Sequence, residues 1–174
     1  MKTSDVIIVG SGASGLFNAL FLPQDYKVIV ITKKEVEESD SFLAQGGISA
    51  LKNPEDYDSY FEDTMKAGHY ENDKGAVEKM IKESPQIIQD LKDFGVRFDL
   101  KDGEIEFTRE GGHSTFRILH HEDLTGKEIT SHLYEEAKKR DNITIMENCT
   151  MIDIIEKDGE CKGIVYKDAD GNLD

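Results

Sequence analysis

The chain has 174 residues, 37% of them hydrophobic, which is enough for one domain with its own core but too little for two full domains. It carries 21 basic and 36 acidic residues, and its formal net charge is −15. This balance argues against nucleic acid or an anionic membrane as the main partner, and the acids, spread through helical stretches, indicate only a solvated surface.

The N-terminus and the cysteines indicate the compartment. Met1 to Asp5 lead into a short apolar run that ends in glycines, which is neither a signal peptide nor a membrane span. Cys149 and Cys161 are the only cysteines, and no Cys-x-x-Cys or neighbouring histidine pair accompanies them. We predict a cytoplasmic protein with reduced cysteines and no bound metal.

The first thirty residues predict a βαβ unit. Val6 to Val9 is an unbroken β-branched run, typical of a buried parallel strand. A helix is expected from Ala13 to Leu22, where Pro23 halts it, and Lys27 to Ile31 is the second buried strand.

Three glycines stand where the first strand meets this helix. Gly10, Gly12 and Gly15 have the spacing of the dinucleotide fingerprint, in which they permit a tight turn, backbone approach to a pyrophosphate and close helix–strand packing. The helix N-terminus would then hold the phosphate oxygens through free N–H groups. The alternative is a purely structural glycine turn.

The end of the second strand weighs against the simplest nicotinamide-dependent dehydrogenase. Such enzymes place an acidic residue there for the ribose, whereas this chain has Thr32 and Lys33, and Glu35 lies past the strand end. From Lys33 to Ser49 the sequence is small and polar, without helical or strand period. A loop of that length within a compact domain is usually functional.

Two helices are predicted next. Asn53 caps the first, with Pro54 at its first position and Gly68 at its end. The second runs from Val77 to Gly95 and should be kinked or broken near Pro85.

The remaining chain alternates short strands, loops and one helix. Thr125 to Glu128 has the spacing of a capping box and opens a helix that continues to Arg140. Before this helix we expect a hairpin over Val96 to Phe107 around Lys101-Asp102-Gly103 and an irregular segment from Arg109 to Asp123. After it we expect strands at Ile143 to Met146, Met151 to Ile155 and Gly163 to Tyr166, with a turn at Asp158-Gly159. A last turn at Asp168 to Asn172 should lead the chain into a returning strand.

One irregular loop carries a family resemblance. Ala44 to Ala50, following Ser39-Asp40-Ser41, resembles the second flavin-contacting segment of the fumarate reductase, succinate dehydrogenase and L-aspartate oxidase superfamily, and Thr32-Lys33 also fits that group. Covalent members carry the flavin on a histidine at the position of Asp40. Because aspartate cannot form that link, the resemblance implies non-covalent FAD.

The second irregular loop resembles one branch of this superfamily more than the others. Arg109 to Ser114, continuing through Arg117 to His120 and Asp123 to Gly126, resembles the L-aspartate oxidase signature rather than that of the respiratory enzymes. The resemblance implies that Glu110 orients the substrate through its ammonium group. The alternative for Glu110 is an ordinary salt bridge with Arg109 or Arg117.

Other polar residues of this loop have open roles. His113, His120 and His121 lack an acidic ligand frame, which argues against metal and favours polar contacts beside flavin or a dicarboxylate. Arg117 could pair a substrate carboxylate bidentately or form a structural ion pair.

The resemblance implies an α/β, Rossmann-like FAD-binding domain with a central parallel sheet and an added β-meander. Residues 1–174 would be its N-terminal part, incomplete at the C-terminus, without the capping and C-terminal helical domains and without the proton-moving arginine. The cofactor residues it implies are Gly10, Ser11, Gly12, Ala13, Ser14, Gly15, Thr32, Lys33, Asp40, Ser41, Phe42, Leu43, Ala44, Gln45, Gly46 and Gly47.

The implied reaction of an intact enzyme is oxidation of L-aspartate to iminoaspartate, toward quinolinate and NAD, with dioxygen or fumarate as acceptor. Quinolinate synthase is a candidate partner in that pathway. Three rivals remain: a fumarate reductase or succinate dehydrogenase flavoprotein, a non-catalytic flavin-binding fragment, and a plain NAD-binding module.

Overall fold

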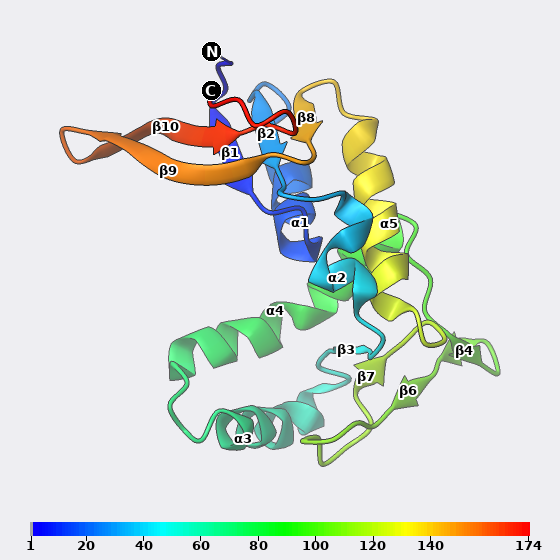
Figure 1. Cartoon of the computed structure of the whole chain (residues 1–174). Coiled ribbons are helices and arrows are strands. Elements are labelled where there is room, and N and C mark those ends of the chain that lie inside the picture. The colour runs from blue at the N-terminus through cyan, green and yellow to red at the C-terminus, as the bar shows by residue number, and fades with distance from the viewer. Residues whose placement is uncertain (1) are drawn as a thin grey trace. The chain divides into compact units, whose positions relative to one another are not determined.

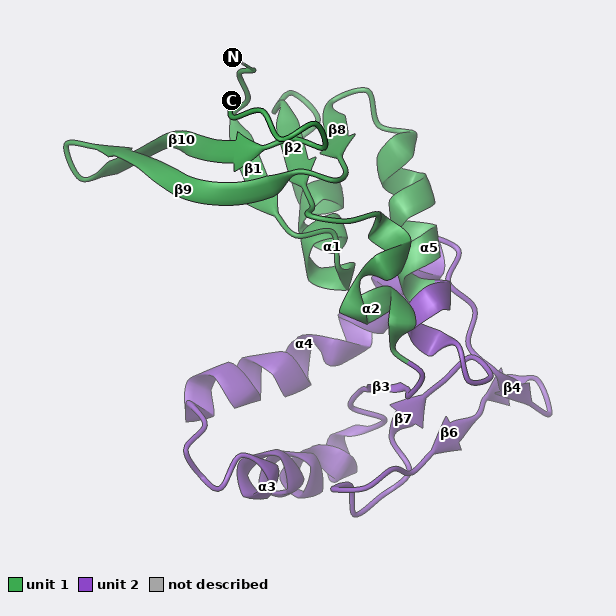
Figure 2. Ribbon diagram, viewed as in Figure 1, with its two compact units in different colours: residues 1–44, 129–174 green, residues 45–128 purple. Residues whose placement is uncertain are grey.

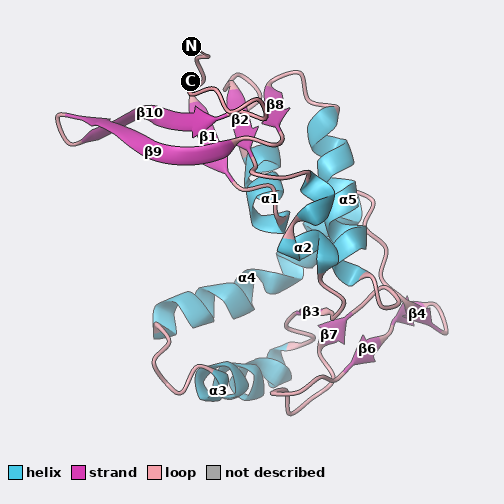
Figure 3. Cartoon of the chain, viewed as in Figure 1, coloured by secondary structure: helices cyan, strands magenta, loops and turns pink. Residues whose placement is uncertain are grey.

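The computed structural model describes residues 2–174 (Figure 1). The chain divides into two compact units: Met1–Ala44 with Ile129–Asp174, and Gln45–Glu128 (Figure 2). The first unit is built from helices and most of the long strands, whereas the second has two longer helices and several very short strands (Figure 3).

A parallel sheet organises the first unit. Strands β1 (Val6–Val9), β2 (Val28–Ile31) and β8 (Ile143–Met146) pair in the order β1-β2-β8, with Val6 opposite Val28 and Val28 opposite Ile143. Helix α1 (Ala13–Phe21) connects β1 to β2. The predicted βαβ unit and the α/β fold class are confirmed.

The core of this unit lies between helix and sheet. Ala19 of α1 is buried against Val28 and Val30 of β2, with Ile8 and Ile143 packed around them. Burying such branched side chains contributes about 1.5–3 kcal/mol each.

The second half of α5 (Thr125–Lys138) also belongs to this unit, and its Leu133 and Ala137 are completely buried. At the start of the helix the predicted capping-box residues have partners in the preceding chain. Thr125 Oγ1 accepts a hydrogen bond from the His121 N–H at 3.0 Å, and the Glu128 carboxylate accepts one from the Arg97 N–H at 3.0 Å. Thr125 therefore fixes the turn just before α5, whereas Glu128 holds the segment around Arg97.

Strand β1 is not buried on both faces, so that prediction was wrong. Ile8 packs toward α1, and Ile7 and Val9 therefore point to the opposite face, where they are 36% and 52% exposed. The β9–β10 hairpin covers this face only in part, leaving a cavity of about 250 Å³ that Ile7, Ile29 and Ile155 help to line.

The predicted meander is present and longer than expected. Strands β9 (Thr150–Lys157) and β10 (Glu160–Lys167) pair around Asp158 and Gly159, whose φ values of 58° and 79° make the turn left-handed. The Asp168–Asn172 turn then returns the chain, as predicted, and Leu173 bridges antiparallel to Lys167.

Two helices and their connections form the apolar core of the second unit. A short 3₁₀ turn, η2 (Pro54–Asp56), leads into α3 (Tyr57–Ala67), and α4 (Lys74–Asp93) follows. Asn53 caps the entry as predicted, because its Oδ1 accepts from the Asp56 N–H at 3.1 Å. The buried contacts between the helices come from Tyr60, Met65, Val77 and Ile81.

Short elements appear where irregular chain was predicted. Strands β3 (Ile48–Ser49) and β6 (Phe107–Thr108) both pair antiparallel with β7 (Ile118–Leu119), and β4 (Leu100–Lys101) pairs with β5 (Glu104–Ile105) around the predicted Asp102-Gly103 turn. In the first unit, η1 (Val36–Glu38) and α2 (Asp40–Leu43) interrupt the predicted loop. Elements of two to four residues are too short to produce a recognisable period.

Helix α4 runs without a break through Pro85, so of the two predicted alternatives, a kink or a break, the break was wrong. Proline cannot donate to the carbonyl four residues earlier, which is that of Ile81. The buried Ser84 hydroxyl donates to this carbonyl at 2.7 Å and also accepts from the Leu51 N–H at 2.9 Å. One side chain thus satisfies both backbone groups.

Ser84→Ala is therefore expected to destabilise the protein by about 1–3 kcal/mol, because it leaves a buried carbonyl and a buried N–H without this partner. Urea unfolding measures the effect. Glu83→Ala is the control, since Glu83 is exposed on the same helix and its 3.9 Å contact with Lys79 should contribute about 0–1 kcal/mol. Equal losses for the two variants would contradict this role of Ser84.

Candidate functional site

The glycine loop has the geometry that the fingerprint predicts. Gly10 adopts a φ of 114°, which favours glycine. Gly12 is the N-cap of α1, no side chain caps the helix, and its first turn carries no acidic residue. A Cβ added at Gly15 would lie 2.0 Å from the Gly10 carbonyl oxygen, so only glycine lets the helix start this close to β1. The helix end is suited to an anion.

A cavity of about 480 Å³ opens beside this loop in the first unit. It collects polar side chains and backbone from the loop, from the end of β2 and from the segment before and into α2. The Ser11 hydroxyl is buried and donates to Thr32 Oγ1 at 2.9 Å, which joins the glycine loop to the end of β2. Thr32 then has its own hydroxyl proton to offer a ligand.

The structure brings many of the predicted cofactor residues to this cavity. Those that line it are Gly10, Ser11, Gly12, Thr32, Lys33, Asp40 and Ser41. Ala13, Ser14 and Gly15 form the first turn of α1 behind them. Phe42, Leu43 and Ala44 lie outside this lining, and Leu43 is exposed.

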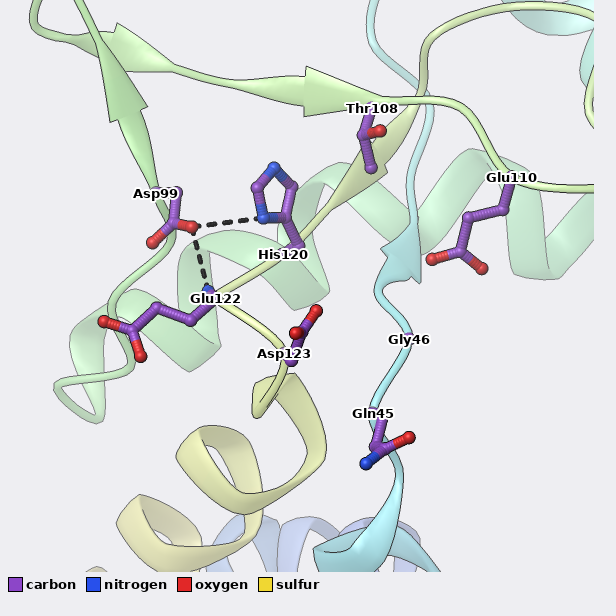
Figure 4. A pocket seen from close by; sticks show the side chains of 8 residues that line it. All are labelled: Gln45, Gly46, Asp99, Thr108, Glu110, His120, Glu122 and Asp123. Atoms are coloured by element: carbon purple, nitrogen blue, oxygen red, sulfur yellow. Dashed lines mark hydrogen bonds and ion pairs between the residues drawn. The ribbon is translucent and has the colours of Figure 1, made fainter.

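The predicted residues Gln45, Gly46 and Gly47 belong to the second unit. There, Gln45 and Gly46 line a cavity of about 620 Å³ together with Glu110, and Figure 4 shows the side chains around it. The other lining residues are Asp99, Thr108, His120, Glu122 and Asp123. Four acidic residues are therefore among those that line this cavity, and neither lysine nor arginine is among them.

Glu110 is held by backbone rather than by an arginine. Its Oε1 accepts from the Gly47 N–H at 3.1 Å, and its carboxylate oxygens would lie 3.3 Å from a Cβ at Gly46. Gly47 is pressed against β7, since an added Cβ would lie 2.2 Å from Ile118 Cγ2. Glycine at both positions thus allows the carboxylate and this segment to meet.

Arg117 is a structural residue with every donor occupied. Its side chain is completely buried; Nε and Nη2 donate to the two oxygens of Asp56 at 2.9 and 2.7 Å, and Nη1 donates to Asp63 at 2.6 Å. The remaining donors meet Ser59 Oγ at 2.7 Å and His113 Nδ1 at 3.1 Å. A guanidinium has five N–H donors, so none is left for a substrate carboxylate.

This network fixes the loop that carries Glu110. Ser114 donates to Asp63 through both its N–H and its hydroxyl, at 2.7 and 2.8 Å, and the Thr115 hydroxyl donates to Asp56 at 2.8 Å. The hydrogen bond from Arg117 lowers the pKa of Asp56 from 3.8 to about 2. Burial raises the pKa of Asp63, but hydrogen bonds from Ser114 and Arg117 outweigh it and lower that pKa overall.

The depressed pKa of Asp56 predicts an acid-sensitive contribution to stability. A carboxyl whose folded pKa lies below its unfolded value stabilises the fold above the unfolded pKa, and this stability is lost as pH falls from about 4 to about 2. The side chain is only 8% exposed, so the loss should be about 2 kcal/mol.

Urea unfolding at a series of pH values tests this prediction. Asp56→Asn should lower stability near neutral pH and flatten the decline across the acid window, because no carboxylate remains to be protonated there. Asp58→Asn, at an exposed position of α3, is the control and should keep the unaltered slope. An Asp56→Asn slope equal to that of the unaltered protein would contradict the assignment.

The three loop histidines have different surroundings. His113 Nδ1 accepts from Arg117 and its ring lies 6.2 Å from that of Tyr60, which makes it part of the structural network. His120 Nδ1 lies 3.1 Å from Asp99 Oδ2, and His121 Nδ1 lies 3.5 Å from Asp99 Oδ1. Among residues 2–174 no group of three His, Cys, Asp or Glu side chains could hold a metal ion.

Sequence reasoning missed part of each site. Cys149 lines the first cavity just beyond the carboxyl end of β8, where the rule for ligand sites in parallel sheets could have placed it. Asp99 and Glu122 line the second cavity without any motif to mark them. Burial raises the pKa of the Cys149 thiol, and Cys149 and Cys161 are both free.

The parallel sheet, the glycine turn and the anion-ready helix end define a dinucleotide-binding α/β protein. The chain matches the FAD binding domain family over residues 5–173 and belongs to that family. FAD is thus its cofactor. The residues around the first cavity fit this ligand, since its lining includes Gly12, the uncapped N-terminus of α1, together with Lys33 and Lys34.

Similar proteins with known names support the predicted resemblance. L-aspartate oxidase of Clostridium perfringens is 42% identical over 165 residues, and that of Clostridium acetobutylicum is 45% identical over 161 residues. These matches cover 95% and 92% of the chain but only 38% and 37% of the relatives. The chain therefore spans less than two-fifths of their length.

Solved structures confirm the predicted fold. Mycobacterium smegmatis Sdh1 in complex with UQ1 superposes with a TM-score of 0.87 at 28% identity, covering 99% of this chain and 32% of that one. Quinol fumarate reductase FrdA of E. coli superposes with a TM-score of 0.88 at 25% identity, covering 94% and 29%. No helix within residues 2–174 is long and apolar enough to cross a membrane.

Proposed function

We propose that the full-length protein oxidises L-aspartate to iminoaspartate with FAD, and that dioxygen or fumarate reoxidises the cofactor. The observation that carries the proposal is the joining of Glu110 to the Gly46-Gly47 segment in a cavity rich in carboxylates. The similarity to L-aspartate oxidases over more than nine-tenths of the chain supports it.

Each part of the chain has a separate task in this proposal. Bound FAD would supply the acceptor for the hydride that leaves the substrate α-carbon. Gly10 to Gly15, Thr32 and Lys33 would hold its pyrophosphate and ribose, and Asp40 to Gly47 would contact its remainder. Asp40 offers no imidazole for a covalent link, which supports non-covalent binding.

The charge of the second cavity supports recognition of an amino acid by its ammonium group. Asp99, Glu110, Glu122 and Asp123 all line the cavity, and nearby negative charge stabilises a cation there. Succinate and fumarate carry only carboxylates, so this lining favours L-aspartate over them. The substrate carboxylates would then bind to residues outside this cavity lining.

The direct test supplies L-aspartate and succinate in parallel to the full-length protein reconstituted with FAD. The proposal predicts oxidation of L-aspartate, with peroxide formed in air. Activity on succinate alone would instead establish the respiratory-type function. A higher affinity for NAD than for FAD would establish a nicotinamide-binding module.

Glu110→Gln is expected to lower kcat/KM for L-aspartate by about 10-fold to 100-fold, because a hydrogen bond to a charged group contributes about 1.5–3 kcal/mol. The glutamine oxygen can still accept from the Gly47 N–H, so FAD affinity should change little. Glu104→Gln, on the exposed end of the β4–β5 hairpin, is the control. A kcat/KM equal to that of the unaltered protein would remove Glu110 from the substrate site.

The proposal also covers the domain extent, the behaviour of the isolated chain, its location and its pathway partner. We treat residues 1–174 as the N-terminal part of one FAD-binding domain, since a single family match runs through both units. The isolated chain is expected to retain FAD weakly or not at all and to show no turnover. A cytoplasmic location and a pathway partnership with quinolinate synthase complete the proposal; the free cysteines suit a reducing compartment.

A further inference from the structure

His120 and Asp99 form a pair on the wall of the second cavity. His120 Nδ1 lies 3.1 Å from Asp99 Oδ2, and the same carboxylate accepts the Glu122 N–H at 2.8 Å (Figure 4). The Asp99 N–H in turn donates to the His120 carbonyl at 2.8 Å. Asp99 is therefore anchored on both sides, which fixes its carboxylate toward the imidazole.

The pair leaves one ring nitrogen for a ligand. A carboxylate beside Nδ1 favours the tautomer that carries its proton there, so the lone pair of neutral His120 is on Nε2. The side chain is partly exposed and lines the cavity together with Glu110, Gln45 and Gly46. An imidazole oriented by a carboxylate in this way can accept a proton, and the carboxylate stabilises the resulting imidazolium.

The proposed reaction requires such a group. When the α-carbon of an amino acid loses hydride, its nitrogen must contribute a lone pair to the new C=N bond. An ammonium nitrogen has no lone pair until one N–H bond breaks. The proton therefore leaves the nitrogen, the former N–H electron pair stays on it, and the hydride leaves with the Cα–H pair to FAD.

We propose that Nε2 of His120 accepts this proton from the substrate ammonium, with Asp99 stabilising the charged ring. The inference rests on the proposed function and assigns a second task within the same cavity: Glu110 orients the ammonium, and His120 deprotonates it. The charged and titratable groups around the ring are Asp99, Glu110, Glu122 and Asp123, with His121 sharing Asp99 from the neighbouring position. Asp99, in contact with Nδ1, is placed to stabilise the charge that the ring gains when it accepts the proton.

The test uses the FAD-loaded full-length protein with His120→Asn. The asparagine amide can replace Nδ1 beside Asp99, whereas nothing replaces Nε2. We expect kcat for L-aspartate to fall by about 100-fold or more near neutral pH, since a general base contributes about 10²–10⁴-fold. The acid limb of the pH profile should move up to the range in which the substrate ammonium itself loses its proton, so the rate should recover only at high pH.

A binding measurement and two further variants separate a catalytic role of His120 from a structural one. The Kd of succinate, followed through the flavin absorbance, should stay within about twofold, because succinate has no ammonium group. His69→Asn, in the α3–α4 loop at a φ of 53° that asparagine tolerates, should leave both quantities unchanged. Asp99→Asn should lower kcat in the same direction, because the charged ring then lacks its counter-charge.

An unchanged pH profile in His120→Asn would overturn the inference, as would a joint loss of succinate binding, which would make His120 a carboxylate ligand or a structural residue. If the unaltered protein does not oxidise L-aspartate, the proposed function fails and this inference fails with it. If the unaltered protein does and His120→Asn behaves like it, only the inference fails.

Discussion

Replacing Gly15 with alanine is expected to lower the affinity of the full-length protein for FAD by about 10-fold to 100-fold. The added Cβ would lie 2.0 Å from the Gly10 carbonyl oxygen and 3.1 Å from its carbon, so the turn before α1 must move. Overpacking of this kind costs about 1–3 kcal/mol, and here it falls on the backbone that forms the phosphate loop. Fluorescence titration of the apoprotein with FAD measures the change.

Gly75→Ala is the matched control for Gly15→Ala. Gly75 also lies in the first turn of a helix, α4, but an added Cβ would meet only the side-chain oxygen of the N-cap Asp73 at 3.3 Å, and no backbone atom. Alanine is a better helix former than glycine, so stability should be equal or slightly higher. Unchanged FAD affinity in Gly15→Ala would contradict the assignment of this turn as the pyrophosphate site.

Arg117→Met is expected to destabilise the protein by about 3–5 kcal/mol, because removing one partner of a buried ion pair leaves uncompensated charge. The side chains of Asp56 and Asp63, 8% and 16% exposed, would both lose their arginine. Ser114 and Thr115, which end the loop that carries Glu110, donate to the same two carboxylates, so Glu110 should lose its fixed position as well. Urea unfolding measures the first effect, and kcat/KM for L-aspartate measures the second.

Arg97→Met provides the comparison for Arg117→Met. Arg97 also pairs with a carboxylate, Glu128 at 3.2 Å, but its side chain is 74% exposed, and such surface pairs contribute about 0–1 kcal/mol. A loss below about 1 kcal/mol in Arg117→Met would show that the buried network is not essential to the fold. Comparing the two variants separates the stability lost with a buried ion pair from the stability lost when any paired arginine is removed.

The features that could be predicted from the sequence are those whose determinants are neighbours in the chain. The three glycines, the strand before them and the helix after them lie within Val6 to Leu22, and the structure has each of them. The Asp158-Gly159 and Asp102-Gly103 turns were predictable for the same reason, since the turn residues themselves supply the left-handed backbone. Local chemistry determines these elements.

The features that were missed depend on residues far apart in sequence. Arg117 binds Asp56 and Asp63 from 61 and 54 positions away, and Glu110 binds the Gly47 N–H from 63 positions away. No local pattern marks such partners, so both roles of Arg117 stayed open until the fold placed it. Pro85 is an intermediate case, because Ser84 beside it supplies the missing donor, but its burial comes from tertiary packing.

Anaerobic mixing of the FAD-loaded full-length protein with L-aspartate tests the central claim most directly. If the protein oxidises L-aspartate, the absorption band of oxidised flavin should bleach within one turnover, and an equal concentration of succinate should leave it unchanged. Persistence of the oxidised band with L-aspartate, or bleaching by succinate alone, would contradict the account.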